Sequence, residues 1–294
     1  MIRKVHIPYL MAMTSRQSKL ILCLVLAVIV TACSLKSVYN RLDYLIPSYV
    51  EGMVSLDEVL EEKVEQRAQL LINWHRNTQL KKYAQLLRTF QQDIGPQLTE
   101  ERLLQHIATI EAFWNSLSLK LNEEMTELLP LLDAQQRLEL FESITEKNED
   151  FQEEYVDIDE QERVELYTDR MLDNYESWLG ELSEVQDRAV KKAAAGLHSS
   201  AELRLQKRKL WQNSIQRILE SNDDSRDKSQ RLREFFENFR IDDAELAAAT
   251  ETNKRVIAQL TVQIIDDLSV AQKQYFFNKT GEYIRIFTEL AENR

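Results

Sequence analysis

The clearest chemical role in this sequence belongs to the thiol of Cys33. Cys33 follows Leu20–Ala32, a run of thirteen apolar or small residues that ends in Val30-Thr31-Ala32. Two small residues after an aliphatic one let a peptidase close around the backbone at this point. Arg16 and Lys19 precede the run and no acidic residue occurs before it, as in a secretory signal. The pattern predicts a secretory signal that ends beside Cys33.

This pattern resembles the lipobox of bacterial lipoproteins, and the resemblance implies cleavage before Cys33 and attachment of lipid to its thiol. As a helix, the run would span roughly 20 Å, which is short of a hydrocarbon core about 30 Å thick. The alternative, an uncleaved N-terminal anchor, therefore fits less well. The resemblance implies three acyl chains, enough for stable anchoring, and Ser34 resembles the residue found in lipoproteins sorted to the outer membrane. Met11 and Met13 are alternative starts to Met1.

Composition narrows the function classes. The chain has a net charge of −12. Removal of 1–32, which holds four basic residues and no acid, leaves 33 basic and 49 acidic residues, a net charge of −16. Such a chain is a poor ligand for nucleic acid and is repelled by anionic lipid. Because Cys23 leaves with the signal and Cys33 carries lipid, no thiol remains for a disulfide, a metal or catalysis.

The tripeptide Trp74-His75-Arg76 is a candidate binding site. Trp and Arg are typical of the residues that dominate protein interfaces. The alternative is structural: Trp74 fills the core while His75 and Arg76 face water or cap a neighbouring helix. An Arg76 buried against Asp43 or another acid of the preceding segment would tie that segment to the body.

A second candidate is the basic stretch 204–209, which contains Arg204, Lys207 and Arg208. One interpretation is a solvated helix face. The other is a contact for an acidic partner, such as lipopolysaccharide phosphate, cell-wall carboxylates or the acidic face of a second copy.

The residue spacing gives no support for a metal, a cofactor or catalysis. Di-iron bundles place Glu three residues before His, but Ile72, Leu103 and Ala195 stand three before His75, His106 and His198. The sequence lacks HExxH, GxSxG, P-loop and GxGxxG motifs. We therefore expect no metal, no cofactor and no enzymatic activity. The opposing hypothesis, an envelope hydrolase, requires carboxylates that converge in a cleft.

The elements that position these residues are expected to be helices. The chain has five Gly and four Pro, with no Pro after Pro130, which argues against a many-stranded protein. Apolar stripes at helical spacing, clearest from Leu103 to Leu128, predict an all-α multi-helix bundle of about nine or ten helices and no sheet. The expected organisation is a signal peptide (1–32), a lipidated N-terminus and tether (33–54) and a helical bundle (55–294), with possible sub-bundles 55–130 and 131–294.

The tether is apolar and aromatic, whereas flexible linkers are rich in Gly and Ser. Its Tyr39, Leu42 and Tyr49 are expected to pack on the body or to lie at the lipid interface. Pro47 is expected to stop any helix that reaches it.

A helix-start pattern recurs: Leu, a capping residue, two residues, then Gln. It occurs around Asp133, Ser183 and Ser269, with a degenerate form at Thr99. The cap accepts from the N3 backbone N–H while the N3 Gln reaches back to the cap's own N–H. The pattern resembles the LTxxQ element of Spy/CpxP-type periplasmic proteins, which implies a chaperone or stress adaptor with an apolar concave surface for clients.

Taken as a whole, the chain resembles an uncharacterised family of Gram-negative proteobacterial lipoproteins. The resemblance rests on the lipobox followed by residues 39–45 (YNRLDYL), on Trp74-His75-Arg76 and on residues 178–183 (WLGELS). It implies an envelope lipoprotein and supplies no catalytic residue. We expect a non-enzymatic binding or structural protein, held by lipid on the periplasmic side of the outer membrane, with an envelope protein or the cell wall as partner.

Overall fold

The protein is built from α-helices joined by short connections. The computed structural model describes residues 32–95, 98–239 and 243–292, and within these ranges it contains no strand. The prediction of an all-α fold is confirmed. The apolar run before Cys33 lies outside the described residues, apart from the backbone of its last residue. The helices are α2 (Ala32–Tyr39), α3 (Leu42–Glu51), α4 (Glu58–Thr78), α5 (Leu80–Asp93), α6 (Glu100–Leu128), α7 (Ala134–Tyr155), α8 (Glu160–Leu179), α9 (Glu184–Ala195), α10 (Ala201–Leu219), α11 (Ser225–Asn238), α12 (Ala244–Asp266) and α13 (Val270–Glu292), with a 3₁₀ turn, η1 (Leu129–Leu131).

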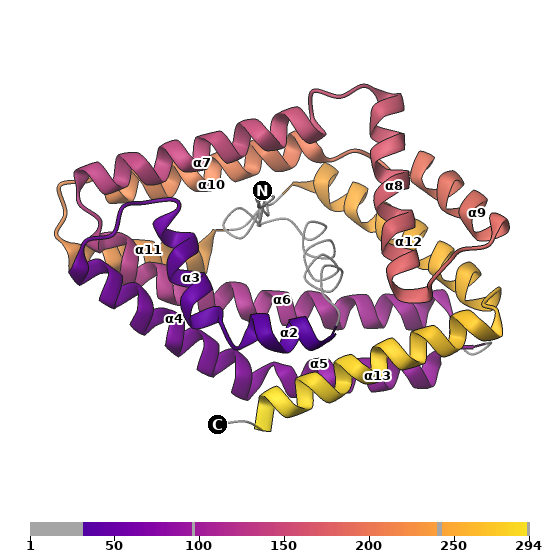
Figure 1. The fold of residues 1–294 in the computed structure, drawn as a ribbon. Helices are drawn as coiled ribbons and strands as arrows, with labels where there is room; N and C mark the ends of the chain where they lie inside the picture. Colours follow the sequence, from indigo (N-terminus) through magenta and orange to yellow (C-terminus); the bar gives the residue numbers. More distant parts are fainter. Residues whose placement is uncertain (1–31, 96–97, 240–242, 293–294) are drawn as a thin grey trace, which may run out of the picture.

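The helices are arranged as a closed frame (Figure 1). Helix α7 lies along α10 on one side of the frame, and α5 lies along α13 on the opposite side. The long helix α6 contacts α4, α11 and α12. Helices from before and after Pro130 therefore pack on one another, and a division into sub-bundles at Pro130 stays a prediction.

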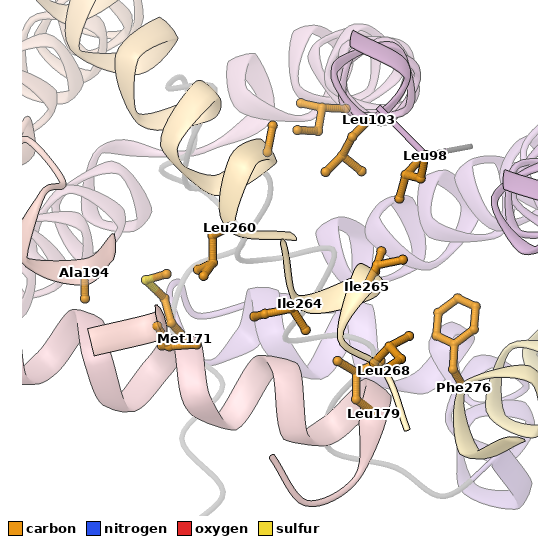
Figure 2. Packing of buried hydrophobic residues seen from close by; sticks show 13 residues of the cluster. Leu98, Leu103, Met171, Leu179, Ala194, Leu260, Ile264, Ile265, Leu268 and Phe276 are labelled. Carbon is orange, nitrogen blue, oxygen red and sulfur yellow. The ribbon is translucent and has the colours of Figure 1, made fainter. Parts of the chain in front are cut away.

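The buried apolar side chains gather at the junctions of this frame. Figure 2 shows a large cluster where α6, α8, α9, α12 and α13 meet. Burial of each such Leu or Ile contributes about 1.5–3 kcal/mol, so apolar packing stabilises this corner of the frame. The buried members of this cluster are Leu98, Leu103, Ile107, Met171, Leu179, Val190, Ala194, Ala258, Leu260, Ile264, Ile265, Leu268 and Phe276.

The recurring pattern caps helices as predicted. In α7, the Asp133 carboxylate accepts the N–H of Gln136 at 2.8 Å, while Gln136 Oε1 accepts the N–H of Asp133 at 3.0 Å. The same reciprocal pair joins Ser183 to Gln186 and Ser269 to Gln272. At the degenerate site, Thr99 accepts the N–H of Arg102. These caps satisfy backbone donors that the first turn leaves open.

The capping glutamines also join helices to each other. Gln272 Nε2 donates to Gln186 Oε1 at 2.8 Å and to the Glu181 carbonyl at 2.9 Å. In return, Gln186 Nε2 lies 3.3 Å from the Asp267 carbonyl and from Gln272 Oε1. Both glutamines are buried. Each therefore uses its oxygen for its own helix start and its amide nitrogen for the other helix, which locks the starts of α9 and α13 together.

The expectation for Pro47 is wrong. Pro47 lies inside α3 and is buried there. Proline removes one backbone donor and strains the preceding turn, but in this short helix its ring is covered by the surrounding chain, and α3 continues to Glu51.

Candidate functional site

His75 bridges the N-terminal segment and the body of the protein. Its Nδ1 lies 3.0 Å from the hydroxyl of Tyr39 in α2, and its Nε2 lies 3.2 Å from the hydroxyl of Tyr83 in α5. The ring of Tyr83 in turn packs against Phe113 and Phe287, with centroids 5.0 and 5.9 Å away. One imidazole from α4 therefore links α2 to α5, and Tyr83 continues the contact to α6 and α13.

Burial sets the charge of this contact. Desolvation lowers the pKa of His75 from 6.5 to about 4, so the imidazole is neutral at neutral pH. Burial also raises the pKa of the Tyr39 hydroxyl, an effect that the Arg76 guanidinium opposes by its charge and a hydrogen bond. Tyr39 accepts a hydrogen bond from Arg76, so it can donate its own hydroxyl proton to Nδ1 of His75. The imidazole proton is then on Nε2, which donates it to the hydroxyl of Tyr83. The result is a neutral hydrogen-bond chain.

The rest of the tripeptide supports the same contact. The Arg76 guanidinium lies 5.5 Å from the ring centroid of Tyr39, a cation–π distance. Trp74 is half-buried, with its ring 6.3 Å from that of His75. Asp43 is exposed and accepts the N–H of Tyr44. Arg76 thus meets an aromatic ring of the N-terminal segment, and the expected packing of Tyr39 on the body is observed.

An apolar floor and one ion pair complete the docking of α2. Tyr39 is 8% exposed and packs with Leu80, Ile286 and Leu290. Lys36 Nζ lies 2.7 Å from the Glu289 carboxylate near the end of α13. We call this set the N-terminal docking site: Lys36, Tyr39, His75, Arg76, Tyr83, Ile286, Glu289 and Leu290.

The residues of the basic stretch are dispersed among structural contacts. Lys207 Nζ lies 3.0 Å from the Asp243 carboxylate. Arg208 is buried, with its guanidinium 4.3 Å from the ring centroid of Phe151 in α7. Burial lowers the pKa of Arg204, although electrostatic interactions with the nearby Tyr167 and Tyr155 oppose this shift. These three predicted binding residues therefore lie where α10 packs near α7, α8 and the start of α12.

A second histidine lies beside a groove between two helices. Asp93 Oδ2 is 2.7 Å from both Arg102 Nε and His106 Nε2, and His106 is buried. Burial raises the pKa of Asp93, but the hydrogen bonds and charges of Arg102 and His106 outweigh it, so the pKa lies below its usual value. The adjacent groove, of about 430 Å³, runs between α5 and α6; its lining residues are Lys81, Lys82, Gln85, Leu86, Thr89, Arg102, Gln105, His106, Thr109 and Phe113.

Sequence reasoning identified His75 and Arg76 but missed the residues that complete both sites. Tyr83 follows His75 by eight positions on a separate helix, and Glu289 follows Lys36 by 253. Asp93 and His106 lie on opposite sides of the connection between α5 and α6. Aromatic and acidic residues at these positions carry no local signal, because their pairing depends on how the helices fold back.

Two features are absent from the described part of the chain. No group of three or more His, Cys, Asp or Glu side chains within residues 32–95, 98–239 and 243–292 is placed to hold a metal ion. No helix in these ranges has the length and hydropathy to cross a membrane.

A family model covers most of the body. It describes DUF6279, a family of unknown function, and matches residues 53–244, which are 192 of the 294 residues. The chain belongs to DUF6279. No curated protein and no solved structure matches it. The DUF6279 match leaves out α2 and α13, two of the four helices that form the N-terminal docking site.

Proposed function

We propose that this DUF6279 protein is a lipid-anchored envelope lipoprotein with a non-enzymatic binding or structural role on the periplasmic side of the outer membrane. The lipobox pattern around Cys33 supports the anchor, and Ser34 supports the outer membrane. An envelope protein or the cell wall is the proposed partner.

The observation that carries this proposal is the docking of the segment that follows Cys33. Lys36 and Tyr39, three and six residues after the cysteine, are held by Glu289 and His75. A lipoprotein that must reach far from its membrane needs a long flexible tether. Here the proposed attachment point lies only a few residues from the helical frame, which suits a protein that organises a partner close to the membrane.

The use of the titratable side chains supports a non-enzymatic role. His75 is neutral and lies between two tyrosine hydroxyls, and His106 is paired with Asp93 beneath Phe90. Lys207 and Arg208 contact Asp243 and Phe151. In each case the contact joins one helix to another, which is a structural use of the group.

Metabolic labelling with a palmitate analogue tests the proposal. We expect the wild-type protein to be labelled and to sediment with outer membranes, and Cys33→Ser to lose the label. Cys23→Ser is the matched control, because that cysteine belongs to the expected signal and its loss should leave labelling unchanged. Label that persists in Cys33→Ser, or that is lost in Cys23→Ser alone, would contradict the proposal. Cross-linking of whole envelopes followed by affinity capture then identifies the partner.

A further inference from the structure

The distance between Cys33 and the frame limits where the membrane can lie. Three residue steps separate Cys33 from Lys36. Even fully extended, they reach at most about 11 Å, and within α2, whose backbone includes Cys33, they rise only about 4.5 Å. Lys36 is fixed to Glu289 at 2.7 Å. The backbone of Cys33, which would carry the acyl chains, therefore lies within about 11 Å of the Lys36 backbone, and the bilayer surface must lie close to this part of the frame.

Exposed side chains of α2, α3 and the turn between them are of types found at membrane surfaces. Val38 is 40% exposed and Tyr44 is 71% exposed, although both are large apolar side chains. Arg41, between them, is also exposed. Tyr is enriched at the headgroup level of membranes, and Arg can cover apolar surface with its stem while its charged end reaches lipid phosphates.

From this geometry we propose that the exposed face of α2 and α3, formed by Val38, Arg41 and Tyr44, lies in the headgroup region of the phospholipid bilayer that holds the anchor. The proposal rests on acylation of Cys33. It adds an orientation: the end of α13 near Glu289 faces the membrane, and its start at Val270, nineteen residues away, points elsewhere. These two ends are about 28 Å apart along the helix.

The charge of the protein makes this contact dependent on the anchor. The exposed Asp43 and Glu51 adjoin the face, and the chain as a whole is acidic. The face alone is too small and too weakly basic to hold the protein on a bilayer. The acyl chains supply the affinity, and the face determines which side of the frame meets the lipid.

Single-cysteine labelling tests this orientation. Acylation consumes Cys33 and cleavage removes Cys23, so the mature wild-type protein should accept no thiol label. In Tyr44→Cys and Val270→Cys, an NBD fluorophore can then be attached at one site each; Val270 is 87% exposed and serves as the matched control. Both variants are purified from membranes with lipid attached and reconstituted into phosphatidylethanolamine–phosphatidylglycerol vesicles.

Bleaching by dithionite, added outside the vesicles to outward-facing protein, is the readout. We expect the fluorophore at position 44 to be bleached several-fold more slowly than that at position 270, and to emit at shorter wavelength. Equal bleaching at the two sites in protein whose wild-type form takes no label would overturn the orientation and leave the anchor intact. Thiol label on the wild-type protein would instead show a free Cys33 and would overturn the proposed function itself.

Discussion

The hydroxyl of Tyr39 lies 3.0 Å from Nδ1 of His75, and this contact fixes the segment next to Cys33 to the helical body. Tyr39 belongs to α2 and His75 to the last turns of α4. The contact turns the expected tether into part of the fold. It also gives Trp74-His75-Arg76 a defined task, which is to receive an aromatic side chain from the N-terminal segment.

Removal of the Tyr39 hydroxyl should loosen this segment. Tyr39→Phe keeps the ring but leaves a buried nitrogen of His75 without its partner, which costs about 1–3 kcal/mol. We expect a lower midpoint of urea unfolding and faster trypsin cleavage after Lys36 and Arg41. Tyr44→Phe is the control, because its side chain is exposed. Equal cleavage rates in wild type and Tyr39→Phe would show that the hydroxyl does not hold the segment.

The same site predicts a pH dependence of stability. The pKa of His75 is about 4 in the fold and 6.5 in the unfolded chain. The unfolded state therefore binds a proton first as the pH falls, and stability is lost between about pH 6.5 and pH 4. A shift of this size corresponds to about 3 kcal/mol.

His75→Gln keeps a donor and an acceptor but cannot titrate in this range. We expect its free energy of unfolding, measured by urea denaturation, to fall less steeply than that of wild type over this interval. His198→Gln is the control, since His198 is exposed, and its slope should match wild type. Parallel curves for wild type and His75→Gln would mean that His75 is protonated as readily in the fold as in the unfolded chain.

The paired capping glutamines predict coupling between two distant helix starts. Each of Gln186→Ala and Gln272→Ala removes one capping hydrogen bond and leaves the side-chain amide of the other glutamine without one of its partners. We expect each substitution to lower the free energy of unfolding by about 1–3 kcal/mol. Because the two side chains bond each other, the double variant should lose less stability than the sum, by about 0.5–3 kcal/mol. Thermal unfolding of all four proteins measures this cycle.

Gln274→Ala provides the comparison for that cycle. Gln274 lies one turn into the same helix, is exposed and bonds only Asn278 among the contacts described. Its loss should change stability by less than about 0.5 kcal/mol. Strict additivity of Gln186→Ala and Gln272→Ala would argue that each glutamine caps its own helix and nothing more.

The basic stretch allows packing and binding to be separated. Arg208→Ala removes a buried guanidinium from the face of Phe151 and should lower stability by about 1–3 kcal/mol. Lys209→Ala, one residue on and exposed, should change stability little. Scanning calorimetry of the two variants and the wild type measures this difference in stability. An Arg208→Ala protein as stable as wild type that no longer captures its partner would restore the binding interpretation.

Much of the fold was predictable because its signals are local. Apolar residues at helical spacing predict the all-α class, and the capping pattern predicts the starts of α7, α9 and α13 without any knowledge of the packing. These features depend on a few neighbouring residues. The position of Pro47 inside α3 was not predictable in this way, because the effect of proline on a helix depends on tertiary burial, which a local pattern does not contain.

The candidate site was predictable only in part, for the same reason. His75 and Arg76 stood out by residue type, but their partners Tyr39 and Tyr83 come from other helices. The sequence showed a run of cations at 204–209, yet not that Arg208 stacks on Phe151 or that Lys207 meets Asp243. Such pairings arise when α10 packs against α7 and the start of α12, and the spacing of residues within one helix does not predict them.

Mass spectrometry of the N-terminal peptide of the protein purified from membranes tests the central claim most directly. Trypsin acts after Lys19 and Lys36, so an unprocessed chain releases the intact peptide Leu20–Lys36. We predict that this peptide is missing and that a peptide beginning at Cys33 carries the added mass of acyl chains. Recovery of the intact, unmodified Leu20–Lys36 peptide as the major species would contradict the lipid anchor and the account built on it.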